Sequence, residues 1–170
     1  GSLVANGGLL GCYWLTKQKN LKMQNAPRYS FDIKKKMSLL GISLIVLLLW
    51  NSMISLVDTV TGHVLSVPMD MDEQKLSIGW MMIMVAVFPA LIEEFAFRKV
   101  IFGVMRQYGF WVAAMFSSSM FGLMHQNIIQ IVFAFGMGLI FCYLYERTGS
   151  IVYCMLLHFI NNGVSVALPY

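Results

Sequence analysis

The stretch WMMIMVAVFPALIEEFAFRKVIF, residues 80–102, is apolar enough to cross a membrane but carries charged side chains. A spanning helix needs about 20 consecutive and mainly apolar residues. Glu93, Glu94 and Arg98 lie within this run, although a charge is costly in the hydrocarbon region. Ionisable residues at membrane depth normally face the interior of a helix bundle and mark functional sites. The stretch therefore predicts a membrane helix with a buried polar site.

The composition of the whole chain agrees with this interpretation. Of its 170 residues, 58% are hydrophobic and only 12% are charged, which is more apolar than an ordinary soluble domain. The length suits one compact bundle and leaves no room for a separate soluble domain. We expect an all-α fold, namely a polytopic transmembrane helix bundle with an intramembrane active-site cavity.

Hydropathy divides the chain into one short apolar segment and five predicted spans. The short segment covers about residues 3–16, and the spans cover about residues 37–57, 77–106, 110–125, 127–145 and 149–168. We therefore expect two regions. Residues 1–36 would form a truncated N-terminal apolar segment and a basic cytoplasmic loop, and residues 37–170 would form the transmembrane core.

Basic residues are concentrated in the first loop. Residues 16–36 carry seven of the twelve Lys and Arg side chains, which predicts that this loop faces the cytoplasm. The formal net charge of +4 is explained by this topology, so we expect the lipid bilayer as a partner and no nucleic acid. Under the same topology, the turns after residues 106 and 147 also return to the cytoplasm.

The charged side chains within residues 91–100 have different expected roles. Glu94 and Arg98 are four residues apart on a helix, so they can form an ion pair that offsets part of the cost of burial. Glu93 lies about 100° further round the helix, and Ala96 and Phe97 occupy its i+3 and i+4 positions. Glu93 therefore needs a partner from another helix.

A proline precedes the charged cluster by one helical turn. Pro89 has no backbone N–H, so it should kink the helix and leave the carbonyl of Val85 without its usual donor. Such a kink would admit water beside Glu93.

Two later spans carry further polar candidates. His125 ends one predicted span, and His158 and Asn162 share a face of the last span at i and i+4. At a rise of about 1.5 Å per residue, these three groups and Glu93 all lie roughly 15 to 25 Å from the cytoplasmic turns. Four polar groups from three helices are thus predicted to meet in one slab of the membrane.

Such a cluster has three chemical interpretations. A carboxylate and hydrogen-bond donors can activate water for hydrolysis and stabilise an oxyanion. Two His residues and one Glu can instead hold a zinc ion with a position open for water. The same groups can relay protons or bind ions in a transporter, although the sequence shows no inverted repeat of broken helices.

Small residues on one span predict close helix packing. Ala134 and Gly138, with Gly136 between them, form a small-xxx-small face that allows two helices to approach closely.

The polar residues fall into three motifs in a fixed order. EEFAFR, residues 93–98, reads E-E-x-x-x-R; FGLMH, residues 121–125, reads F-x-x-x-H; and HFINN, residues 158–162, reads H-x-x-x-N. The ordered set resembles the CAAX-protease and bacteriocin-processing (ABI) family of intramembrane proteases. Members of this family are similar to type II CAAX prenyl endopeptidases. The resemblance covers roughly residues 77–168, and relatives usually have further N-terminal spans.

The resemblance implies a glutamate-type peptidase without a cofactor. Glu93 would activate a water molecule with help from His125, while His158 and Asn162 would donate to the oxyanion. Glu94 and Arg98 would support the site. In a zinc-dependent alternative, Glu93, His125 and His158 would be the ligands. Asn is a better oxyanion donor than zinc ligand, which favours the metal-free form.

The resemblance also implies a substrate class. We expect an endopeptidase of a bacterial plasma membrane that cuts membrane-associated or amphipathic peptides, such as a precursor peptide, pheromone or bacteriocin. A non-catalytic bacteriocin-immunity or scaffold protein of the same fold is the alternative function. The intact set of Glu93, His125, His158 and Asn162 argues against lost catalysis.

Overall fold

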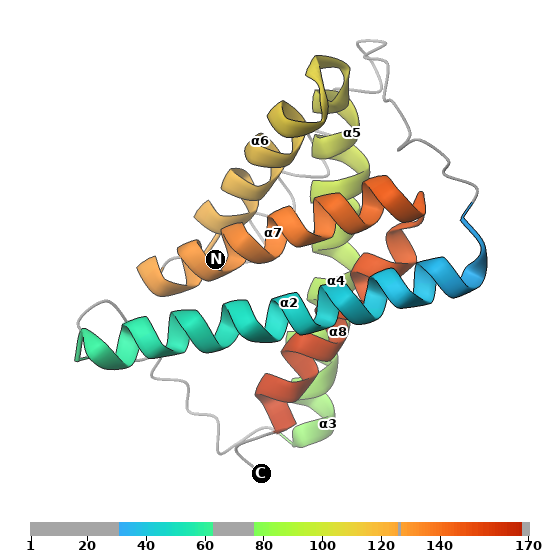
Figure 1. Ribbon diagram of the computed structural model, residues 1–170. Coiled ribbons are helices and arrows are strands. Elements are labelled where there is room, and N and C mark those ends of the chain that lie inside the picture. The colour runs from blue at the N-terminus through green and yellow to red at the C-terminus, as the bar shows by residue number, and fades with distance from the viewer. Residues whose placement is uncertain (1–30, 63–76, 126, 168–170) are drawn as a thin grey trace.

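The described part of the chain is built from helices alone. The computed structural model describes residues 31–62, 77–125 and 127–167, and no strand occurs among them. The helices are α2 (Ile33–Val60), α6 (Phe110–Leu123), α7 (Ile128–Thr148), α8 (Ile151–Ala167) and a long helix from Ile78 to Tyr108 (Figure 1). The predicted all-α bundle is confirmed, and the five predicted spans match these helices to within a few residues. The predicted apolar segment at residues 3–16 lies outside the described residues.

The long helix is not uniform. It consists of α3 (Ile78–Met81), a π-helical segment η2 (Met82–Val87), α4 (Phe88–Glu94), a second π-helical segment η3 (Phe95–Phe102), α5 (Gly103–Met105) and a 3₁₀ turn η4 (Arg106–Tyr108). π-Helical turns are rare and often occur at functional sites. The two glutamates end the short α-helical segment that separates η2 from η3.

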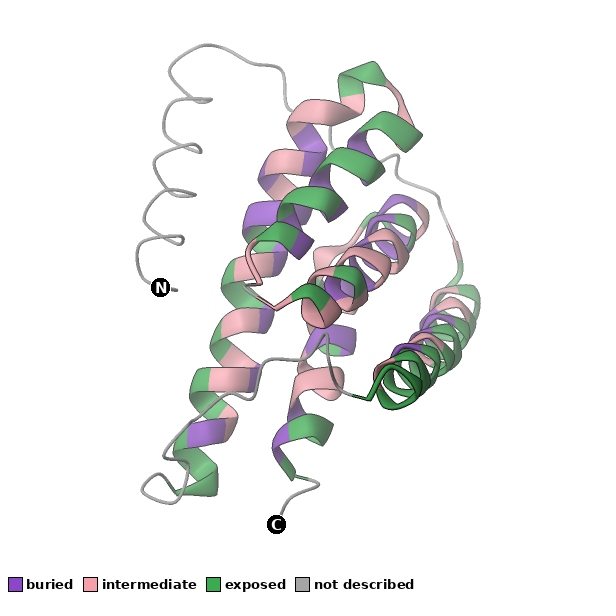
Figure 2. Ribbon diagram, turned by 90° about the vertical axis from the view of Figure 1, so that its left-hand side faces the viewer, coloured by how far each residue is buried: buried purple, intermediate pink, exposed green. Residues whose placement is uncertain are grey.

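Three of the helices are long and apolar enough to cross a membrane. They are α2, the long helix Ile78–Tyr108 and α7, with 28, 31 and 21 residues, whereas α6 and α8 are shorter apolar helices. Many large apolar side chains on these helices are exposed, and Figure 2 shows in green where exposed residues lie along the helices. Such faces suit contact with lipid rather than water. The chain is thus a multi-pass membrane protein.

Close approach of α7 to its neighbours depends on small residues, as predicted. An added Cβ at Gly138 would lie 2.9 Å from the Cβ of Ser118 on α6, and one at Gly136 would collide with the indole of Trp50 on α2. Ala134 is buried on the same helix. Trp50 also donates a hydrogen bond from Nε1 to the backbone carbonyl of Phe133, at 3.0 Å. α7 therefore packs closely against α2 on one side and against α6 on another.

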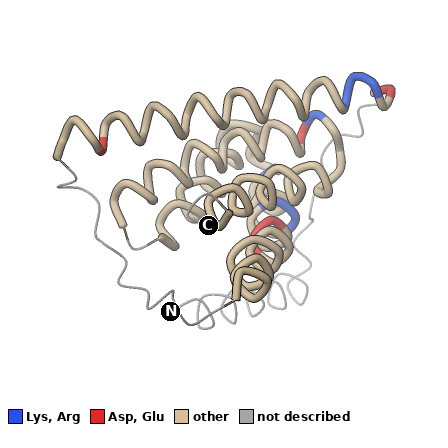
Figure 3. Tube along the Cα trace, turned by 90° about the horizontal axis from the view of Figure 1, so that it is seen from below, with Lys and Arg blue, Asp and Glu red and all other residues tan. Residues whose placement is uncertain are grey.

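Charged residues lie mainly at helix ends. Figure 3 shows basic positions at one end of the bundle, where α2 begins and α7 ends, and further basic positions on the long helix. Here Arg106 at the end of the long helix makes two hydrogen bonds to Glu146 on α7, at 3.0 and 2.6 Å. This ion pair was not predicted from the sequence. The ion pair links the end of the long helix to the end of α7 at the predicted cytoplasmic side.

Candidate active site

A side chain from α8 donates to the backbone carbonyl that Pro89 leaves without its usual donor. Pro89 lies at the start of α4 and cannot donate to the carbonyl of Val85. Instead, Asn162 Nδ2 donates to the Val85 carbonyl oxygen at 3.0 Å. The predicted free carbonyl thus has a partner from another helix. The side-chain amide nitrogen of Asn162 carries two N–H donors, and the bond to Val85 uses one of them.

Glu94 and Arg98 form the predicted ion pair at the centre of the bundle. Arg98 Nε lies 3.1 Å from Glu94 Oε2, and both side chains are fully buried. The contact is a close ion pair without the alignment of a hydrogen bond. Within the described ranges, the two terminal nitrogens of Arg98 also have no hydrogen-bond partner.

Aromatic rings enclose the Arg98 guanidinium group. Its central carbon lies 4.5 Å from the ring centre of Phe121, 5.1 Å from that of Phe141 and 6.0 Å from that of Phe97. The ring faces attract a cation electrostatically, and more strongly where water is excluded. These contacts compensate in part for the missing hydrogen bonds.

Glu94 has a second partner, His158 on α8. Its Oε1 lies 2.9 Å from His158 Nδ1, and the imidazole is almost fully buried. An imidazole that donates from Nδ1 to a carboxylate is fixed in its orientation, so that its other nitrogen points to the opposite side. The rings of Phe121 and Phe141 also contact the imidazole, with centres 5.9 and 5.6 Å away.

Glu93 lies on the other side of the same imidazole. Its Oε2 is 4.0 Å from His158 Nε2, and its side chain is 18% exposed, in contrast to the fully buried Glu94. The interhelical partner that the sequence required for Glu93 is therefore His158. A partly exposed carboxylate beside an oriented imidazole is able to bind and polarise a water molecule.

His125 joins the site through Phe121. It lies just after the end of α6, its Nδ1 is 3.1 Å from the carbonyl oxygen of Phe121, and its ring packs edge-on against the Phe121 ring at 5.4 Å. The Nδ1 contact directs Nε2 away from the helix. Phe121 thus touches both histidines and Arg98, a role that was not assigned from the sequence. The sequence feature that could have indicated this role is the F-x-x-x-H motif, which places Phe121 four residues before His125.

The zinc-dependent alternative names Glu93, His125 and His158 as ligands. Across residues 31–62, 77–125 and 127–167, no three His, Cys, Asp or Glu side chains lie close enough together to hold one ion. Glu93 and His158 are neighbours, but His125 does not complete a set of three with them. In the described residues, Glu93, His125 and His158 are thus not gathered into one set of three ligands.

Comparisons with known proteins place these residues in a family. Residues 75–164 match the model of the family described as type II CAAX prenyl endopeptidase Rce1-like. The membrane-embedded CAAX protease MroQ of Staphylococcus aureus (strain USA300) is 29% identical over 165 residues, which cover 86% of this chain and 65% of that protein. A protein of Bacillus subtilis (strain 168) named membrane peptidase YdiL is 32% identical over 93 residues, which cover 54% of this chain and 38% of that protein.

The chain thus spans less than two thirds of the length of these curated relatives. No solved structure shows significant similarity to it. The matched region contains all three motifs, from Glu93 to Asn162, and spans more than half of the chain. The family suggested by the motifs is confirmed, and the chain belongs to the Rce1-like family of type II CAAX prenyl endopeptidases.

Proposed function

We propose that this protein is an intramembrane endopeptidase in which Glu93 activates the attacking water molecule. The supporting observation is the contrast between the adjacent glutamates. Glu94 is fully buried and lies against both Arg98 and His158, whereas Glu93 is partly exposed beside the far nitrogen of the same imidazole. One carboxylate supports the site and the other is accessible to water.

In the proposed reaction, Glu93 accepts a proton from water while the water oxygen attacks the carbonyl carbon of the scissile peptide bond. His125 helps to orient this water through its outward-facing Nε2. The proton is then delivered to the leaving nitrogen as the C–N bond breaks, which releases an amine and a carboxylic acid. General acid–base catalysis of this kind contributes about 10² to 10⁴ in rate.

The negative charge that develops on the carbonyl oxygen needs donors on the α8 side. As an imidazolium with a proton on each ring nitrogen, His158 would donate from Nε2 while its Nδ1–H remains bound to Glu94, and Asn162 would donate the N–H that does not bind Val85. Both residues lie on one face of α8, and both are held by the long helix. Removing one oxyanion donor typically lowers kcat by about 10² to 10³.

The position of the site supports a substrate that lies in or at the membrane. Glu93 and His158 lie on helices with largely apolar outer faces, so the substrate must reach them within the membrane. We therefore propose a membrane-associated or amphipathic peptide, and the family resemblance supports a precursor peptide, pheromone or bacteriocin.

The test is a comparison of peptides by mass spectrometry in membranes and medium. Cells would express the wild-type chain, Glu93→Gln or Asp58→Asn at matched membrane levels. Asp58 lies near the far end of α2 and serves as the control for loss of an acidic residue. We expect a defined fragment with the wild-type and Asp58→Asn chains and its absence with Glu93→Gln. Identical peptide profiles for wild type and Glu93→Gln would contradict catalysis, and bacteriocin resistance that survives in Glu93→Gln would then indicate an immunity role.

Metal dependence is tested separately with the purified protein. Cleavage of the peptide identified above is expected to continue in the presence of 1,10-phenanthroline, with no stoichiometric zinc by elemental analysis. Loss of cleavage with the chelator, followed by recovery on addition of zinc, would favour the zinc-dependent mechanism instead.

A further inference from the structure

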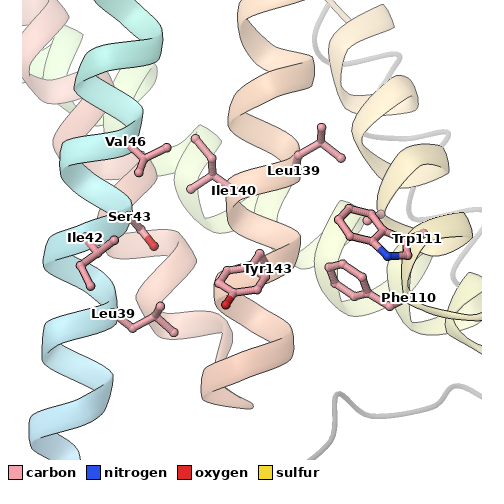
Figure 4. Close-up of a pocket in the computed structure, with 10 residues that line it drawn as sticks. Leu39, Ile42, Ser43, Val46, Phe110, Trp111, Leu139, Ile140 and Tyr143 are labelled. Atoms are coloured by element: carbon pink, nitrogen blue, oxygen red, sulfur yellow. The ribbon is translucent and has the colours of Figure 1, made fainter.

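A separate groove lies on the outer side of the bundle, between α2, α6 and α7. It encloses about 280 Å³ and is lined almost entirely by apolar side chains (Figure 4). From α2 come Ile42 and Val46, from α7 comes Ile140, and from α6 comes Trp111, whose side chain is 72% exposed. None of the candidate catalytic residues lines this groove.

The groove continues into a basic hollow at one end. This second hollow, of about 360 Å³, shares Leu39, Ile42 and Tyr143 with the first and is also lined by Lys35 and Arg147. The Arg147 guanidinium group lies 5.1 Å from the ring centre of Tyr143. An apolar channel therefore leads to two cationic side chains from different helices.

The channel runs along α2 for a distance comparable to half the thickness of a bilayer's hydrocarbon core. Lys35 and Val46 are eleven residues apart on α2, which is about 16 Å along the helix. The hydrocarbon core of a bilayer is about 30 Å thick, so one leaflet contributes roughly half of that. The basic end belongs to the side predicted to be cytoplasmic, where anionic lipid headgroups attract Lys and Arg.

The local charge balance favours an anionic ligand. Asp32 precedes α2, but Lys34, Lys35 and Lys36 follow it within one turn. At the end of α7, Glu146 is engaged by Arg106. The basic end of the groove therefore has a net positive charge.

We propose that this groove binds an anionic phospholipid of the cytoplasmic leaflet. The phosphate lies beside Lys35 and Arg147, and one acyl chain follows the apolar channel past Ile42 toward Val46. This site is independent of the proposed peptidase activity.

The test measures which lipids remain bound to the purified protein. The 170-residue chain is equilibrated with mixed micelles that contain equal amounts of phosphatidylglycerol and phosphatidylcholine, and retained lipid is quantified by native mass spectrometry. Lys35→Ala removes one headgroup contact, and Val46→Trp fills the far end of the channel. Lys34→Ala and Leu48→Trp are the matched controls, because neither residue lines the groove.

We expect the wild-type protein to retain phosphatidylglycerol preferentially. Lys35→Ala should reduce this retention about fivefold, the equivalent of about 1 kcal/mol for one basic residue near a membrane surface. Val46→Trp should also reduce retention, whereas both controls should behave as wild type. Equal retention of the two lipids by the wild type, or equal losses in the controls, would overturn the proposal. A change in oligomeric state with Val46→Trp at an unchanged lipid ratio would also overturn it, since a second copy would then occupy the groove.

Discussion

Replacing Arg98 by methionine tests whether the central ion pair supports the fold. Methionine keeps much of the aliphatic volume but removes the charge, which leaves Glu94 fully buried without its cation. Breaking a buried pair in this way typically costs about 3 to 5 kcal/mol. Because Glu94 keeps its contact with His158 at 2.9 Å, we expect the lower end of that range. The lost interaction of the guanidinium group with the Phe121 and Phe141 rings adds to the cost.

The assay is thermal unfolding in one detergent at matched protein concentration. A loss of about 3 kcal/mol corresponds to a decrease in Tm of roughly 6 to 12 °C for a chain of this length. Glu93→Gln is the control, because Glu93 is partly exposed and its contact with His158 is longer, at 4.0 Å. Its Tm should stay close to that of the wild type.

A double variant separates the effect of an unpaired buried Glu94 carboxylate from the other effects of Arg98→Met. In Glu94→Gln/Arg98→Met, no buried carboxylate is left without a cation, and the glutamine oxygen can still accept from His158. We expect this double variant to be more stable than Arg98→Met alone. Equal Tm values for Arg98→Met and Glu93→Gln, or a double variant less stable than the single one, would refute the division of roles between the two glutamates.

Three further substitutions test the packing around the site by the same unfolding measurement. Gly136→Ala should destabilise the protein by about 1 to 3 kcal/mol because the added Cβ collides with the indole ring of Trp50. Gly41→Ala is the control and should not destabilise the protein, because a Cβ at Gly41 meets nothing within 4 Å. Equal changes in Tm for the two variants would contradict the close packing at Gly136. Ser117→Ala should cost about 1 to 3 kcal/mol, since the hydroxyl group donates to the buried carbonyl of Phe97 in η3 at 2.8 Å; an unchanged Tm would show that this carbonyl needs no partner. Arg106→Lys should cost about 1 kcal/mol because lysine cannot reproduce the two parallel hydrogen bonds, and wild-type stability would show that charge alone is sufficient.

The contacts that the sequence predicted are those with local causes. Helical spacing alone pairs Glu94 with Arg98, and the missing N–H of Pro89 alone exposes the Val85 carbonyl. The structure confirms both, and it also confirms that Glu93 needs a partner from another helix. Of the four polar groups expected in one slab, His158 lies beside both glutamates and Asn162 bonds to Val85, whereas the hydrogen bond and ring contact of His125 are with Phe121.

The contacts that the sequence did not predict depend on the relative rotation and crossing of helices. The bond from Asn162 to Val85 joins residues 77 positions apart, and the contact from His158 to Glu94 joins residues 64 positions apart. The π-helical segments were also missed, because their apolar composition is the same as that of an α-helix. The pairing of Arg106 with Glu146 needed the orientation of α7, which its nearly all-apolar sequence does not reveal.

The position of Arg98 on the same helix as Glu94 has a consequence for how the chain enters the membrane. During synthesis the long helix is complete before α8 exists, so His158 is not yet available to Glu94. The helix nevertheless carries its own counter-charge one turn away, which lowers the cost of placing either group in lipid. A chain that ends after Gly109 should therefore integrate this helix more efficiently with both charges present than with Arg98→Ala, as glycosylation mapping would report. We therefore expect the pair that stabilises the finished bundle also to help this charged helix enter the bilayer before the rest of the site has been made.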